Sequence, residues 1–200
     1  MDRTSVDVTT DLLQALNAMG RRDGPGRETA SRPTPGPASD DPRALYERYR
    51  METSANGASP EAIRFLRRAA AAGSSRAQVE LGNLYRRGEG VPQDLHAAWN
   101  AYVTAARAGD VEAMTNLGVM YDQGQTVAPD PERACRCYQY AAQRGFVVAQ
   151  YNLAIMLAEG LGTRRDRAAA CHWFGLAAAQ GHRPAAEALE WLQEVMAASS

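Results

Sequence analysis

The chain has 200 residues, a formal net charge of −1 and 45% hydrophobic residues, many of them alanine. The near-neutral charge argues against a dedicated nucleic-acid binder, and three cysteines do not suit a disulfide framework. Alanine-rich, aromatic-poor composition favours closely packed helices over a β core. No apolar run is long enough to span a membrane, and the N-terminus lacks the apolar core of a secretory signal, so we expect a cytoplasmic protein.

Residues 1–40 are predicted to be a disordered tail. A short helix is predicted at 9–19, where Leu12, Leu13, Leu16 and Met19 share one face. Residues 21–40 hold four prolines and three glycines, which is the composition of a linker. One interpretation is that the tail is disordered or serves as a docking element for another protein. The other is that it folds back into the groove described below.

Beyond the tail, the sequence repeats with a fixed step of 36 residues. A constant period in this range is typical of a solenoid, in which each unit packs only on its neighbours. The most regular positions are Gly73, Gly109, Gly145 and Gly181; Ala77, Ala113, Ala149 and Ala185; and Leu81, Leu117, Leu153 and Leu189.

Each repeat is predicted to be a pair of helices. Aspartates at 94, 130 and 166 are predicted caps of the second helices, and glycines at 88, 124 and 160 end the first helices. Gly82, Gly118 and Ala154 are predicted to let two helix backbones approach closely. The first helices are expected at 75–87, 111–123 and 147–159, and the second at 94–108, 130–144 and 166–180. The repeats are a degenerate first unit at 41–72, then 73–108, 109–144 and 145–180, with a capping helix at 181–198.

The pattern resembles the Sel-one-like repeat, a subclass of the tetratricopeptide superfamily. The resemblance covers 41–198 and implies a right-handed α-solenoid of antiparallel helix pairs. It further implies a concave groove that binds other proteins, as in bacterial regulatory or signalling adaptors. Some cysteine-rich relatives are linked to β-lactam binding, but their paired cysteines are missing here. The residues that carry the resemblance are Ala77, Leu81, Gly82, Tyr85, Gly88, Gly90, Val91, Asp94 and Ala98.

Cysteine and histidine side chains raise the question of a zinc site. Cys135 and Cys137 are two residues apart on one predicted helix, so they point to different sides. They and Cys171 are predicted to be buried or half-buried thiols. No acid–base or nucleophile constellation accompanies the scattered histidines, so we expect no catalytic residue, cofactor or metal, and no enzyme. The sequence therefore favours a protein-interaction scaffold, and an enzyme and a nucleic-acid binder are the alternatives to it.

The groove is predicted to be lined by first-helix positions beside the core stripe. It runs from an arginine-biased end to an apolar end, which predicts a partner segment with an apolar anchor and, at its other end, acidic residues. The alternative is that the arginines form a solvated face and that Trp191 seals the last unit. The predicted lining is Arg43, Glu47, Arg50, Val79, Asn83, Arg86, Thr115, Val119, Asp122, Tyr151, Ile155 and Trp191, with Ala158, Glu187 and Glu194 at equivalent positions.

Overall fold

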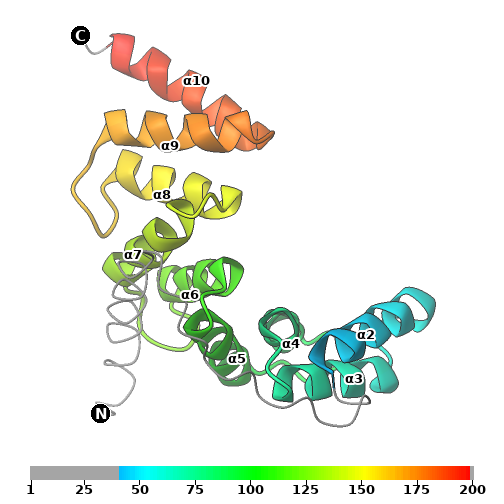
Figure 1. The fold of residues 1–200 in the computed structure, drawn as a ribbon. Coiled ribbons are helices and arrows are strands. Elements are labelled where there is room, and N and C mark those ends of the chain that lie inside the picture. The colour runs from blue at the N-terminus through cyan, green and yellow to red at the C-terminus, as the bar shows by residue number, and fades with distance from the viewer. Residues whose placement is uncertain (1–40, 199–200) are drawn as a thin grey trace, which may run out of the picture. The chain divides into compact units, whose positions relative to one another are not determined.

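The structure is a computed structural model that describes residues 41–198 (Figure 1). All secondary structure in this range is helical, which confirms the predicted all-α class. The predicted tail at 1–40, with its helix at 9–19, lies outside the described residues. The elements are α2 (Pro42–Asn56), α3 (Pro60–Ala71), α4 (Ser75–Arg87), α5 (Leu95–Arg107), α6 (Val111–Gln123), α7 (Pro131–Ala142), α8 (Val147–Glu159), α9 (Arg167–Ala179) and α10 (Arg183–Ala198).

The second helix of each regular pair begins at a capping aspartate, as predicted. The carboxylate accepts a hydrogen bond from the backbone N–H three residues later, which satisfies one of the free donors of the first turn. The first helices α4 and α8 end at Gly88 and Gly160, whose φ angles of 72° and 77° lie in the left-handed region. The capping bonds are Ala97 N–H to Asp94 at 2.9 Å, Arg133 N–H to Asp130 at 3.0 Å and Ala169 N–H to Asp166 at 2.9 Å.

Within a pair, the first helix presents a small residue to a ring on the second. A Cβ atom added to Gly82 would lie 2.5 Å from Cε1 of Tyr102, and one added to Gly118 would lie 2.7 Å from the same atom of Tyr138. Both distances are far below van der Waals contact, so each glycine makes room for a tyrosine ring of the second helix. The close neighbour is this ring and not the helix backbone that the sequence analysis predicted. The Tyr102 hydroxyl also donates a hydrogen bond of 2.8 Å to Asn83 Oδ1.

The chain divides into two compact units, the first ending at Ala113 and the second beginning at Met114. In the first unit, one core cluster combines residues of α2, α3 and α4, including Leu45, Leu66 and Leu84. In the second unit, Figure 1 shows α8, α9 and α10 side by side, and their buried residues form another cluster that includes Phe174 and Leu192. Each cluster draws on more than one helix pair, as expected of a solenoid.

We expect Gly82→Ala to lower thermal stability. Alanine favours a helix over glycine by about 1 kcal/mol, but overpacking against the Tyr102 ring costs about 1–3 kcal/mol. Gly175→Ala on α9 is the matched control, because its added Cβ would meet only Leu189 at 3.9 Å. Thermal melts by circular dichroism should move down for Gly82→Ala and up for Gly175→Ala. Shifts in the same direction would contradict the close packing.

Caps and core positions should differ in their effect on stability. Asp130→Ala should cost about 1 kcal/mol through the lost cap. Leu117→Ala should cost about 2–5 kcal/mol, because Leu117 is fully buried and its truncation leaves a cavity. Chemical denaturation of both variants gives the two free energies of unfolding, and a larger loss for Asp130→Ala would contradict the assignment of cap and core.

Candidate protein-interaction surface

The predicted arginine-biased end lies on α2 in the first unit. Arg43, Glu47 and Arg50 are all exposed. Arg50 Nη1 lies 3.4 Å from Glu47 Oε2, with both side chains 61% exposed. An ion pair this exposed contributes little to stability, so both groups can exchange their contact for one with a partner.

Beside these residues, α2 and the start of α4 enclose an open hollow of about 610 Å³. The Arg76 guanidinium carbon lies 5.7 Å from the centre of the Tyr46 ring, so this rim combines an aromatic face with a cation. The sequence prediction missed both of these residues. The hollow is lined by Pro42, Arg43, Tyr46, Glu47, Gly73, Ser74, Ser75 and Arg76.

The next predicted set, on α4, lies deeper in the first unit. Val79 is 3% exposed and offers no surface to a partner, so we remove it from the candidate surface. Asn83 and Arg86 are half-buried. Asn83 already accepts the hydrogen bond from Tyr102, and burial raises the pKa of the Tyr102 hydroxyl, which keeps it protonated as the donor. Arg86 also hydrogen-bonds Tyr102, and Asn83 also hydrogen-bonds Glu112, so both side chains of this set are partly exposed but already have partners within the chain.

The predicted apolar end lies in the second unit. Thr115 on α6 is 3% exposed and is also removed, whereas Val119 is half-buried and Asp122 is exposed. On α8, Tyr151 and Ile155 are half-buried and pack against the core cluster shared with α9 and α10. These side chains thus combine a structural contact with a remaining exposed apolar edge.

Histidine 182 adds a contact to Tyr151 that the sequence prediction missed. The two ring centres are 4.7 Å apart, and the Phe174 ring centre lies 5.7 Å from that of Tyr151. His182 Nδ1 also accepts the backbone N–H of Ala185 at 3.2 Å, so its ring is held at the start of α10. Its place in the period could have indicated this role, because Asp110 occupies the equivalent position and caps α6.

Tryptophan 191 on α10 does not seal the last unit. Its side chain is 59% exposed, whereas the adjacent Leu192 is 2% exposed and belongs to the core cluster. The sequence alternative in which Trp191 covers the core is therefore wrong. Glu187 and Glu194, one helical turn before and after it, are exposed as well.

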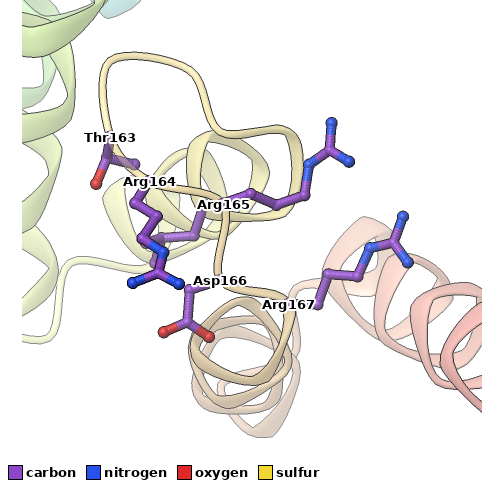
Figure 2. Close-up of a pocket in the computed structure, with 6 residues that line it drawn as sticks. Thr163, Arg164, Arg165, Asp166 and Arg167 are labelled. Carbon is purple, nitrogen blue, oxygen red and sulfur yellow. The ribbon is translucent and has the colours of Figure 1, made fainter.

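A second hollow of about 610 Å³ lies at the loop between α8 and α9 (Figure 2). Arg164, Arg165 and Arg167 line it together with Asp166. Figure 2 shows the three guanidinium groups pointing apart instead of converging on one point. Asp166 is engaged as the cap of α9. This arrangement does not form a cradle for an anionic group.

The cysteines are buried or half-buried, as predicted. Cys137 is fully buried, Cys135 is 7% exposed and Cys171 is half-buried, and all three are free thiols. Burial raises the pKa of the Cys137 thiol to about 12, so it stays neutral at physiological pH. Within residues 41–198, no group of three or more His, Cys, Asp or Glu side chains could hold a metal ion. None of the helices in this range has the length and apolar character needed to cross a membrane.

The helix pairs match a known family model along most of the described chain. The model of the Sel1 repeat matches residues 59–74, 75–110, 111–146 and 147–182. The chain belongs to the Sel1 repeat family. The matches at 75–110, 111–146 and 147–182 each begin two residues after the unit defined from the glycines, so the period is the same and only its starting point differs. The match at 59–74 covers only the second half of the degenerate first unit predicted at 41–72. Sel1 repeat proteins generally act in protein–protein interaction, as scaffolds and not as enzymes.

Solved structures of other Sel1 repeat proteins have the same fold. One is c5321, a protective antigen of uropathogenic Escherichia coli strains, with 29% identity and a TM-score of 0.72 over 80% of this chain and 35% of that chain. A Sel1 repeat protein from Oxalobacter formigenes has 29% identity and a TM-score of 0.71, covering 76% of this chain and 61% of its own. This chain therefore spans between a third and two thirds of those proteins. No match was found among curated proteins.

A more distant relative supports the fold alone. A Sel1 repeat protein from Klebsiella pneumoniae has 21% identity and a TM-score of 0.51, with 78% of this chain and 79% of that chain covered. At this identity the shared feature is the backbone architecture and not a binding specificity.

Alkaline pH should destabilise this Sel1 repeat protein. Burial raises the pKa of Cys137 and of Tyr49 to about 12, from 9.0 and 10.0, and it raises the pKa of Tyr138 further still. The contribution of these buried groups to the free energy of unfolding is complete below about pH 9. It is lost as the pH rises towards their pKa values in the folded chain, because in this range only the unfolded chain releases the protons. Each group adds a slope of up to about −1.4 kcal/mol per pH unit to the free energy of unfolding.

Denaturant titrations of the wild type between about pH 8 and pH 11 measure that slope. Cys137→Ala should be less stable at pH 8 because of its cavity, but its stability should fall less steeply above pH 9. An identical slope for the variant and the wild type would show that Cys137 does not titrate differently in the folded and unfolded chains.

Proposed function

We propose that this chain is a bacterial adaptor that binds an extended or helical segment of a partner protein, in a regulatory or signalling role. The observation that carries the proposal is the partly exposed apolar edge on α8, formed by Tyr151, Ile155 and Ala158. Apolar side chains that remain accessible on a first helix are typical of interaction sites, and tyrosine is a frequent anchor.

The charges near the candidate surface suggest what the partner carries. In the first unit, Arg43 and Arg50 are exposed, and Glu47 offsets part of their charge. These arginines favour acidic residues in the partner, whereas the Tyr151 edge favours a large apolar side chain. Because the two sets belong to separate compact units, each is proposed as a binding element in its own right.

Membership of the family supports the same class of function. Sel1 repeat proteins act through protein contacts, and the buried positions of this chain are used for stacking the pairs. The convergent acid–base group that would favour an enzyme is not seen within 41–198. The near-zero net charge and the exposed acids Glu47, Asp122 and Glu194 disfavour a nucleic-acid track.

A peptide library displayed on phage provides partner segments for the test. The full chain is panned against random peptides, and the enriched peptides are then titrated calorimetrically. Tyr151→Ala should weaken the apolar class of peptides by about tenfold or more, equivalent to about 1.4 kcal/mol. Arg50→Ala should weaken the acidic class by a smaller factor that shrinks at high salt.

Leu176→Ala is the matched control, because Leu176 is an exposed apolar residue, 39% accessible, on the second helix α9 of the same pair. It should leave peptide affinity unchanged, and circular dichroism should show that all three variants keep their helices. If the peptides lose affinity with Leu176→Ala and not with Tyr151→Ala, the binding surface lies on the second helices and the proposal is wrong.

A further inference from the structure

In α4 and α10, the same position of the repeat packs on the pair that precedes the helix. Leu84 belongs to the cluster that contains residues of α2 and α3, so its position faces backwards along the chain. The equivalent residues Met120, Met156 and Leu192 are all at most 3% exposed. In α2 this position holds Arg48, which is exposed, and no described helix precedes α2.

An arginine–aromatic cluster therefore stands at the backward-facing end of the first unit. The Arg48 guanidinium carbon lies 4.7 Å from the centre of the Phe65 ring on α3, and that of Arg64 lies 5.9 Å from the same ring. Arg64 also pairs with Glu61 at 3.0 Å, where both side chains are more than half exposed. Over both helices, α2 and α3 carry six arginines and three glutamates, so this end is basic.

In the second unit, the opposite face of the first helix α8 packs on the helix that follows its pair. The ring centre of Tyr151 on α8 lies 4.7 Å from that of His182 at the start of α10. Ile155 packs on the core cluster that includes residues of α10. The equivalent residues of α10 are Glu187 and Trp191, which are both exposed, and no described helix follows α10. The forward-facing end of the second unit thus presents an indole among carboxylates.

We infer that these two faces bind each other between copies of the chain, so that the protein assembles head to tail. The basic face is defined by the exposed Arg48 and Arg64, which lie over the buried Phe65 ring, and the acidic face by Glu187, Trp191 and Glu194. The indole would stack on the exposed guanidinium groups, while the glutamates pair with them. A second copy is the occupant that the charges favour, because α10 carries three glutamates and a single arginine.

The internal ion pairs of these faces do not prevent such docking. Arg183 Nε lies 2.9 Å from Glu187 Oε1, but the two side chains are 89% and 63% exposed. Pairs of this kind exchange readily for new partners. Because the two faces differ, the contact is heterologous and leaves one face of each kind open at the ends of every assembly, so that copies continue to add.

Sedimentation velocity of the full chain from about 5 μM to about 500 μM tests the assembly. The weight-average mass should rise with concentration, and it should rise less when salt increases from about 50 mM to about 500 mM. Trp191→Ala and Arg48→Glu should each weaken self-association by at least about tenfold. Met51→Ala is the control: Met51 is 72% exposed on α2, at a position that is exposed in α4, α6 and α8 as well.

Mixing the two weakened variants identifies the head-to-tail arrangement. Trp191→Ala keeps an intact basic face and Arg48→Glu keeps an intact acidic face, so together they should form a dimer that grows no further. A symmetric contact between two α10 helices predicts instead that Arg48→Glu associates alone as well as the wild type, which would overturn the inference. A wild type that stays monomeric throughout, or an equal loss with Met51→Ala, would also overturn it. This test uses no partner peptide and is independent of the surface around Tyr151.

Discussion

The fold depends on the inability of a single helix pair to bury its own apolar stripe. Leu45 of α2, Leu66 of α3 and Leu84 of α4 belong to one cluster, so the first pair and the start of the next share their core. Apolar burial is the main favourable term in folding, and here part of it is obtained between pairs. The residues that stack the pairs are consequently lost to partners.

Local features of this fold could be predicted from the sequence because each has a short-range cause. A cap needs a side-chain acceptor three residues before its donor, and Asp94, Asp130 and Asp166 repeat that signal three times. The close approach at Gly82 follows in the same way from a small residue within a helical stripe. Because the period is fixed, each of these signals recurs at the same position in every repeat, and the apolar positions of one helix predict those of the equivalent helix in the next repeat.

Accessibility at the candidate surface could not be predicted in the same way, because it depends on the tertiary surroundings of each side chain, which the repeat position alone does not determine. Arg43, Val79 and Thr115 occupy one position of the repeat, yet the first is exposed and the other two are 3% exposed. A long arginine reaches solvent past its neighbours, whereas a short side chain at the same position is covered. Comparison with the period would, however, have separated Trp191 from Leu192, since only Leu192 falls in register with buried Met120 and Met156.

The contact between the paired helices also links residues that lie far apart in the sequence. Tyr102 meets glycine at 82 and donates its hydroxyl to Asn83, whereas Phe174, which has no hydroxyl, occurs with Ala154 and Ile155 at the equivalent positions. In the pair between them, Tyr138 meets Gly118 but Val119 stands at the position of Asn83, so the acceptor does not always accompany the tyrosine. The ring and the small residue that faces it form the matched set, with tyrosine opposite glycine and phenylalanine opposite alanine. Homologous repeats are expected to exchange these two residues together during evolution, so covariation between the two columns would reveal the pairing of helices from sequences alone.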